Sequence, residues 1–550
     1  MLYTDTNAPR GHTYPAESFT GFRPQKQRSK EKLIFNCQHV DLQRCASLFP
    51  HIHLHLKDIS LENIAIYNQN VNNIKCYLGR KISDYFPFFL CSKTCFGTYC
   101  SIFNLQMLKS RAILTLTLQP LCKFWHLMWL NHTFILYLCQ IIEKTIKIII
   151  KTMTTHISNR VQSLSPSQTL AMSQKSNELK AQGIDVINLS VGEPDFNTPD
   201  HIKEAAKQAI DNNFSFYTPV PGYMSLRKAI AAKLKNENGL DYTPEQIVVS
   251  GGAKQSLCNV ILSVINPGDE VIIPTPAWVS YVEMVKLAEG VNVLVPAAIE
   301  QDFKVTPEQL EAAITPKTRM VLICSPSNPT GSVYTKEELA ALVKVLAKYP
   351  DVLVLADEIY EHINFTGSFT SLASFPEIAD RTIVVNGVSK AYAMTGWRIG
   401  YIAAPLWVAK ATNKLQSQYT SGASSIAQKA AEAAYVGPQD CIEEMRVAFQ
   451  RRRDLVVSLA REIPGLKVNE PQGAFYLFPE VSSYFGKKYG DRVINNAADL
   501  AMYLLEEGHV ATVDGEAFCL PGYIRLSYAT SDDNIREAMR RIKDALAKLA

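Results

Sequence analysis

Apolar residues form short uninterrupted runs of strand length through the middle of the chain, and stretches with helical spacing separate these runs. The runs cover residues 247–249, 270–273, 291–295, 320–324, 352–355, 382–385 and 399–403. An uninterrupted apolar run indicates a strand that is buried on both faces. The pattern therefore predicts an α/β fold, in which a mostly parallel seven-stranded sheet lies between helices.

Helical patterns and shorter strands flank this region in the sequence. Helices are predicted at 169–182, 201–212 and 226–238, with Gly183 and Gly239 as stop signals, and a strand at 186–191. Beyond about residue 430, longer helices at 440–461, 497–507 and 533–549 surround short strands at 474–478 and 523–528. This second pattern predicts a smaller α+β domain.

The first 152 residues show no capped helix, no repeat and no signal peptide. They contain 18 Lys and Arg against 8 Asp and Glu, whereas the remainder contains 38 against 44. We interpret them as translated sequence upstream of a start at Met153. A membrane anchor, with 124–142 as its span, and the DNA-binding front of a regulator are the alternatives. The predicted divisions are 1–152, unassigned; 153–195, joining the small domain; 196–430, the large domain; and 431–550, the small domain.

Cysteine usage after Met153 indicates reduced thiols. Cys258, Cys324, Cys441 and Cys519 are widely spaced and include no CxxC pair. We therefore expect a cytoplasmic protein. We also expect no metal site, and neither nucleic acid nor a membrane among its partners.

One lysine follows an apolar run directly. Lys390 lies in a small-residue turn after 382–385, and Arg398 follows eight residues later. An ammonium group that loses hydration has a lowered pKa, and its neutral amine is a nucleophile able to react with an aldehyde. Arg398 would hold an anion nearby. A solvated surface lysine is the alternative.

Other polar groups follow neighbouring runs. The glycines of SGGAKQS (250–256) open a predicted helix, whose N-terminus favours a phosphate, although a plain turn has the same pattern. Asp357 ends one run and suits a protonated heterocyclic nitrogen or, alternatively, a helix N-cap. Asn328 lies in a rigid turn, and Trp278 could stack on a planar ring or pack in the core. Arg525, within an apolar strand, requires a carboxylate from a ligand or from the chain itself.

Six motifs together resemble the pyridoxal-phosphate-dependent aminotransferases of fold type I, in the class I family that includes bacterial aspartate aminotransferases. The motifs are VGEPDF, SGGAKQ, SPSNPTG, DEIYE, NGVSK followed by TGWRIGY, and YIRLSYAT, in the order of the family. The resemblance covers residues 153–550. It implies a homodimer with shared active sites and a ping-pong reaction between an amino acid and a 2-oxo acid.

The resemblance also implies residue roles. Lys390 would carry pyridoxal 5'-phosphate and move the substrate's α-proton, and Asp357 would hold the pyridine nitrogen. The phosphate would be held by Arg398, Ser389, the backbone of Gly252, Ala253 and Lys254, and Tyr217 from the other subunit. The cofactor ring would contact Asn328, Tyr360 and Trp278. Arg525 would bind the α-carboxylate with Asn328 and Gly192.

Substrate choice depends on fewer residues. Lys254 and Thr169, in SPSQT, resemble the bacterial subgroup that acts on aspartate, glutamate and, in some members, prephenate, and Lys254 is our candidate for the distal carboxylate. Gly387 departs from the family, because many relatives have a phosphate-binding serine there. Transamination of aromatic or branched amino acids and β-elimination are the alternatives on the same scaffold.

Overall fold

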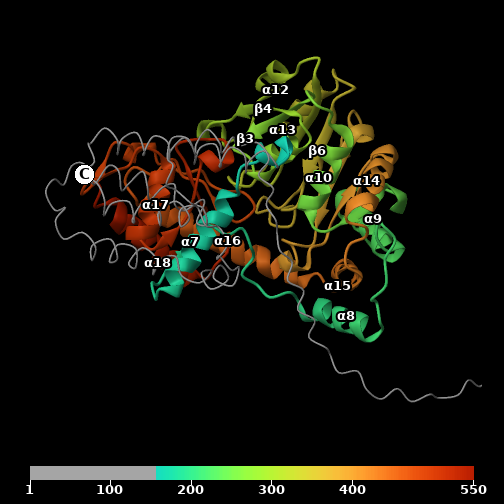
Figure 1. Ribbon diagram of the computed structural model, residues 1–550, viewed down its shortest axis with the longest axis horizontal. Coiled ribbons are helices and arrows are strands. Elements are labelled where there is room, and N and C mark those ends of the chain that lie inside the picture. Colours follow the sequence, from blue (N-terminus) through green and yellow to red (C-terminus); the bar gives the residue numbers. More distant parts are fainter. Residues whose placement is uncertain (1–156) are drawn as a thin grey trace, which may run out of the picture. The chain divides into compact units, whose positions relative to one another are not determined.

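The seven predicted strands form one sheet in the computed structural model, which describes residues 157–550 (Figure 1). The predictions for residues 1–152, including the span at 124–142, lie outside those residues. The strands are β2 (Ile247–Ser250), β3 (Glu270–Thr275), β4 (Val291–Pro296), β5 (Thr318–Cys324), β6 (Leu353–Asp357), β7 (Thr382–Gly387) and β8 (Gly400–Ala403). Their order is β2-β8-β7-β6-β5-β3-β4, and only β8 runs antiparallel to its neighbours. The predicted mostly parallel sheet is confirmed.

Helices cover both faces of this sheet. Along β6, Leu353 and Leu355 pack into one apolar cluster, whereas Val354 and Ala356 pack into another on the opposite face. The first face is covered by α10 (Ala253–Val264), α11 (Ser280–Leu287) and α14 (Leu406–Tyr419). The second is covered by α9 (Met224–Asn238), α12 (Pro307–Ala313), α13 (Lys336–Leu346) and α15 (Ser425–Val436), with α8 (Asp200–Asp211) against α15. Two-sided burial explains why the strands read as uninterrupted apolar runs.

A second lobe contains the carboxyl-terminal helices. Its core is formed by α16 (Asp440–Arg461), α17 (Ala497–Glu507) and α18 (Asp532–Leu546) around the three-stranded sheet β13 (Val513–Asp514), β14 (Ile524–Ser527) and β9 (Tyr476–Leu477). A separate hairpin joins β10 (Lys488–Tyr489) to β11 (Arg492–Val493). The N-terminal β1 (Ile187–Asn188) pairs with β12 (Val510–Ala511), and α7 (Gln168–Ala181) contacts β12 and β13. The short α6 (Asn159–Gln162) lies against α11.

Two predicted strands are shorter than expected. β9 begins at Tyr476 rather than at residue 474, because Ala474 has a φ of 54°, in the left-handed region that strands do not use. β1 ends at Asn188, whose side chain accepts a hydrogen bond from the Ser190 N–H at 2.9 Å. This local bond turns the chain out of the strand.

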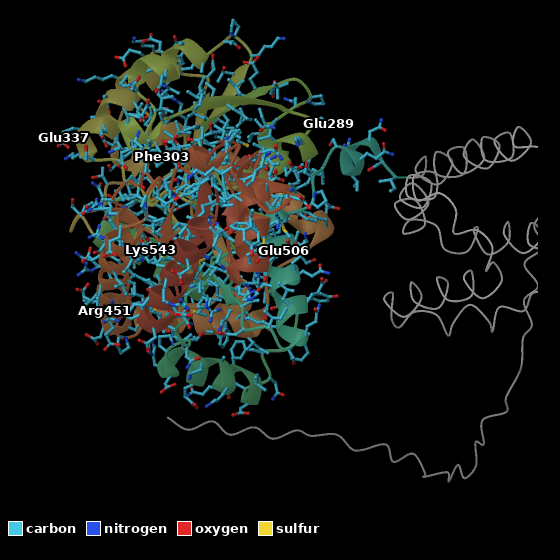
Figure 2. All side chains as sticks on the ribbon, turned by 90° about the vertical axis from the view of Figure 1, so that its left-hand side faces the viewer. Glu289, Phe303, Glu337, Arg451, Glu506 and Lys543 are labelled. Atoms are coloured by element: carbon cyan, nitrogen blue, oxygen red, sulfur yellow. The ribbon has the colours of Figure 1, made fainter. Side chains whose placement is uncertain are left out.

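Charged side chains cover the outside of the described region. Those of Glu337, Arg451 and Lys543 are exposed and lie on its surface (Figure 2). Within residues 157–550, no helix has both the length and the apolar character that a membrane span requires. The four described cysteines form no disulfide with one another, as predicted.

Candidate active site

The carboxyl ends of three adjacent strands bring the predicted polar groups to one edge of the sheet. Cys324, at the end of β5, is in register with Asp357, at the end of β6, and Asp357 is in register with Val385 of β7. The turns that follow carry Asn328 and Lys390. In parallel sheets, ligands bind at this edge.

The amine of Lys390 lies against a backbone carbonyl group and two aromatic rings. Its Nζ donates a hydrogen bond to the Gly192 carbonyl oxygen at 2.6 Å and lies 5.6 Å from the ring centroid of Tyr360. Burial lowers the pKa of this amine to about 8, although the nearby Glu193 acts in the opposite direction. A larger fraction of this amine than of an ordinary lysine is therefore neutral near physiological pH, and the neutral amine is the form that acts as a nucleophile or base.

Asp357 is a buried carboxyl group without a cationic side chain bonded to it among the described residues. It is 4% exposed, and it accepts hydrogen bonds from Tyr281 Oη at 2.6 Å and from the Ile359 N–H at 3.3 Å. Burial raises the pKa of Asp357 to about 6 in spite of these bonds. The helix N-cap alternative is wrong, because turns and short 3-10 segments, without an α-helix, connect β6 to β7.

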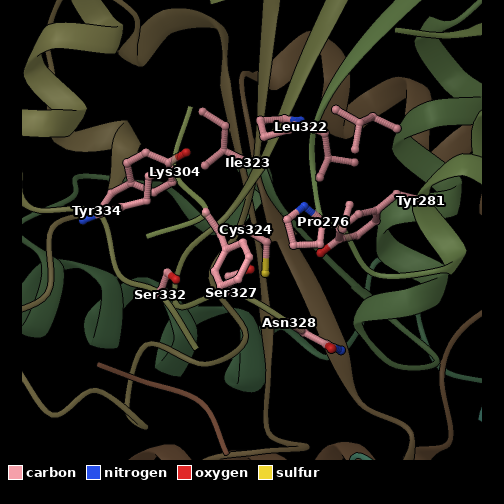
Figure 3. Close-up of a pocket in the computed structure, with 14 residues that line it drawn as sticks. Pro276, Tyr281, Lys304, Leu322, Ile323, Cys324, Ser327, Asn328, Ser332 and Tyr334 are labelled. Atoms are coloured by element: carbon pink, nitrogen blue, oxygen red, sulfur yellow. The ribbon is translucent and has the colours of Figure 1, made fainter. Parts of the chain in front are cut away.

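A small pocket lies beside this carboxyl group. Its walls include Tyr281, Cys324 and Asn328, together with residues of β3 and β5 (Figure 3). Burial is the main reason why the pKa values of the Tyr281 hydroxyl and the Cys324 thiol are raised. Sequence reasoning missed Tyr281 as a partner of Asp357, since the two residues are 76 positions apart.

Arg525 is a buried cation that the described chain does not neutralise. It is 2% exposed, and its Nη1 and Nη2 donate to Asn328 Oδ1 at 3.0 Å and to the Ser190 carbonyl oxygen at 2.6 Å. Its Nε has no partner, and none of the carboxylates in residues 157–550 forms an ion pair with it. No acid within residues 157–550 is therefore the carboxylate that Arg525 was expected to require. A buried charge without a counter-ion is costly, so this site suits an anionic ligand.

A cradle for a second anion lies where β2 meets α10. Gly252 caps the helix with a φ of 93°, and Arg398 donates from Nη2 to the Gly251 carbonyl oxygen at 3.2 Å. Ser389, the residue before Lys390, is buried. At Gly387, a Cβ would lie only 2.7 Å from the Ile399 carbonyl oxygen. A side chain at this position would therefore require the neighbouring backbone to shift.

Lys254 and Trp278 lie next to one another at this edge. The Lys254 Nζ is 4.9 Å from the Trp278 ring centroid, and the Trp278 ring meets Tyr281 edge to face at 5.3 Å. Burial, and then the charge of Arg398, lower the pKa of Lys254. The side chain is nevertheless exposed, so its charge is available to a ligand.

Two predicted residues form no hydrogen bond with this cluster in the described chain, and a second member of the cluster was missed by sequence reasoning. Tyr217 is 98% exposed, and Thr169 is half-buried in α7, without a hydrogen bond to the cluster within the described chain. Tyr360 and Tyr476 share a hydrogen bond at 2.8 Å between their hydroxyl oxygens. Tyr476 gave no clear signal in the sequence, because GAFYLF is an ordinary apolar strand pattern.

The family model for "Aminotransferase class I and II" matches residues 184–542. The chain therefore belongs to this family, as its motifs predicted, and it is an aminotransferase. Aspartate/prephenate aminotransferase from Nitrosomonas europaea is 49% identical over 395 residues, which are 71% of this chain and 100% of that protein. A bifunctional aspartate aminotransferase and glutamate/aspartate-prephenate aminotransferase from Petunia hybrida is 50% identical over 72% of this chain and 83% of its own length.

Solved structures confirm the fold type. The aspartate aminotransferase from Rhizobium meliloti has a TM-score of 0.70 and 46% identity, covering 72% of this chain and 99% of its own. The Thermus thermophilus aspartate aminotransferase with maleate has a TM-score of 0.67 and 42% identity, covering 71% and 99%. The described chain thus has fold type I, the fold that its motifs predicted.

Proposed function

We propose that this aminotransferase depends on pyridoxal phosphate and moves the amino group of aspartate or glutamate to a 2-oxo acid such as 2-oxoglutarate, with prephenate as a further acceptor. The observation that carries the proposal is the buried Arg525, whose guanidinium has no carboxylate partner in the described chain, beside the lowered-pKa amine of Lys390. The names of the similar proteins support the choice of substrates.

The unmatched groups suit this cofactor chemically. The raised pKa of Asp357 indicates a carboxyl group that lacks a positive neighbour, and a protonated pyridine nitrogen would be one. The helix end at Gly252, together with Arg398 and Ser389, suits a phosphate. When bound, pyridoxal phosphate supplies an aldehyde and an electron-withdrawing ring. Tyr360 and Asn328 would hold the ring oxygen, and Trp278 would stack on the ring.

The side chains around the substrate would then divide the work. Arg525 would bind the α-carboxylate in two-point fashion, with Asn328 and the Gly192 backbone beside it. Lys390, as a neutral amine, would take the proton from the substrate Cα and deliver it to the cofactor carbon. Lys254 would bind the distal carboxylate of aspartate, and Thr169 would lie near that end. A ping-pong reaction follows, because the amino group stays with the enzyme between the two half-reactions.

We also propose a homodimer in which the partner supplies Tyr217. Both Phe216 and Tyr217 are large and highly exposed, at 80% and 98%, which is unusual for neighbouring aromatic residues. In a dimer, Tyr217 would reach the phosphate of the other subunit. Light scattering of the full chain should give twice the mass of one chain, and Tyr217→Phe should weaken cofactor binding without dissociating the dimer.

A steady-state assay of the full-length protein tests the function. With aspartate and 2-oxoglutarate, double-reciprocal plots should be parallel, and borohydride should fix a pyridoxyl group on Lys390, detectable by mass spectrometry. Prephenate should replace 2-oxoglutarate as acceptor. Faster turnover of aromatic donors, or release of ammonia and pyruvate, would support the alternative reactions instead. A protein that takes up no pyridoxal phosphate would contradict the proposal.

A further inference from the structure

Tyr476 contacts three residues of the candidate active site, namely Tyr360, Arg525 and Gly192. It is buried in β9, and its hydroxyl shares the 2.8 Å hydrogen bond with Tyr360. The Arg525 guanidinium lies 4.6 Å from the centroid of its ring. A Cβ at Gly192 would collide with the Tyr476 hydroxyl, so the backbone that accepts the Lys390 hydrogen bond also packs against it.

The strand register explains these contacts. Tyr476 pairs with Ser527 across the antiparallel strands β9 and β14, and Arg525 lies two residues before Ser527, on the same face. Diagonal neighbours on one face of a sheet are within reach of long side chains. Tyr360 comes instead from the segment after β6. The hydrogen bond therefore joins the carboxyl-terminal lobe to the lobe that contains the seven-stranded sheet.

The chemistry of a phenol makes this bond directional. Each hydroxyl has one proton, so only one of the two tyrosines donates to the other. The positive charge of Arg525 beside the Tyr476 ring makes that hydroxyl the better donor. A nearby cation stabilises the phenolate, so the neutral phenol is more acidic and donates its proton more readily. When Tyr476 donates to the Tyr360 oxygen, the Tyr360 proton is left for an acceptor on a ligand.

We propose that Tyr476 is a positioning residue that aims the Tyr360 hydroxyl at the cofactor ring oxygen and supports Arg525 in its carboxylate-binding position. This inference rests on the proposed function, since the ring oxygen belongs to pyridoxal phosphate. Tyr476 acts through its two neighbours and joins the carboxylate site to the cofactor site.

A double-mutant cycle on cofactor affinity tests the first part. The dissociation constant of pyridoxal phosphate is measured by fluorescence for the full-length apoprotein and for Tyr476→Phe, Tyr360→Phe and the double variant. Tyr476→Phe should weaken binding about five-fold, the usual magnitude for one neutral hydrogen bond. It should have no further effect in the Tyr360→Phe background. An equal effect in both backgrounds, or no effect in either, would overturn the proposal.

The second part is tested with a dicarboxylate. Maleate affinity, followed by the absorbance of the loaded protein, should fall about five-fold in Tyr476→Leu, which removes the ring face, and stay unchanged in Tyr476→Phe. Equal affinities in all three proteins would contradict the support of Arg525. Thermal unfolding of each variant identifies any loss of fold, and Tyr476→Phe still tests the first part if the leucine variant misfolds.

Tyr528→Phe is the matched control. Tyr528 is also buried in this lobe, and its hydroxyl donates to the Ala474 carbonyl oxygen at 3.3 Å. This variant should leave both affinities unchanged. If the wild-type apoprotein binds no pyridoxal phosphate, the proposed function fails; if it binds and Tyr476→Phe matches it, only the present inference fails.

Discussion

Two buried clusters of charged residues include a carboxylate each, one from the end of β6 and one from the segment that follows it. They differ in whether their charges are paired. In one, Glu361 accepts hydrogen bonds from Lys233, from Asn386 Nδ2 at 2.7 Å and from Asn238 Nδ2 at 2.9 Å. In the other, described above, Asp357 and Arg525 each lack an oppositely charged partner within residues 157–550. Only three residues of sequence separate the two carboxylates.

The difference distinguishes a structural ion pair from a site prepared for a ligand. Burial alone would raise the pKa of Glu361, but the charges of Lys233 and His362 bring it down to about 2. Burial raises the pKa of Asp357 to about 6 and lowers that of Lys390 to about 8, because neither group has sufficient compensation. In a matched cluster the charges offset one another's cost of burial, whereas an unmatched cluster needs a ligand to remove the cost of its buried charges.

The matched cluster also supports the other one. Asn386 is the penultimate residue of β7, the strand that leads to Lys390, and its side chain donates a hydrogen bond to Glu361, four residues after Asp357. This hydrogen bond therefore joins the segment that follows Asp357 to the strand that leads to Lys390.

Lys390→Ala should give the largest effect on activity. Loss of a positioned acid and base reduces the rate by a factor of about 10²–10⁴. The same change should not lower the stability of the apoprotein, because it removes an ammonium group that is poorly hydrated in the native state. Initial rates and urea unfolding measure the two quantities. Lys348→Ala, which breaks only the exposed Lys348–Glu311 pair, should change neither. Near-normal activity in Lys390→Ala would place the essential amine elsewhere.

Glu361→Leu should have the opposite profile. Lys233 would lose its buried partner and, among carboxylates, keep only the longer contact with Glu237, at 3.6 Å. Breaking a buried pair from one side costs up to about 3–5 kcal/mol of unfolding free energy. The double variant Lys233→Met/Glu361→Leu should recover most of this loss, since it removes both charges. Urea unfolding of the apoprotein measures each value. If Glu361→Leu is no less stable than Arg525→Leu, the contrast between the two clusters is wrong.

The two carboxylates should give pH dependences of opposite sign. The native pKa of Asp357, about 6, is above its unfolded value of 3.8, so apoprotein stability due to this group falls as pH rises from about 4 to 6. Glu361, with a native pKa of about 2 and an unfolded value of 4.5, gives stability that is lost as pH falls from about 4.5 to 2. Each contribution reaches up to about 3 kcal/mol. Asp357→Asn should remove the first slope and Glu361→Gln the second, as measured by urea unfolding across pH 3–8.

Most of the large lobe and the centre of the site could be predicted from the sequence, because local patterns of apolar and polar residues determine them. Uninterrupted apolar runs predicted all seven strands of the sheet, because two-sided burial leaves a clear pattern. Lys390, Asp357 and Asn328 were predicted together, since each follows such a run and parallel strands end at the same edge. The two-residue strands β1 and β9 were predicted too long, because an Asn188 side-chain bond and a left-handed Ala474 end the pattern without changing its hydrophobicity.

Long-range partners could not be predicted in the same way. Tyr281 and Tyr476 appear as ordinary aromatic residues of a core, and only the fold brings them to Asp357 and Tyr360. Glu361 was visible only as a letter of the DEIYE motif. Its partner Lys233 lies 128 positions away, so the matched cluster has no local signature.

Lys254→Ala should give the smallest effect, and it tests where the unmatched site ends. Lys254 is exposed beside Trp278, and a solvated ion pair contributes roughly 1 kcal/mol or less, so kcat/KM for aspartate relative to alanine should fall by up to about five-fold. Alanine, which has no distal carboxylate, is the internal reference, and Lys254→Arg should retain the preference. An unchanged ratio would mean that another group binds the distal carboxylate. A fall much larger than five-fold would mean that ligand binding buries Lys254, which would make it part of the unmatched cluster rather than of the protein surface.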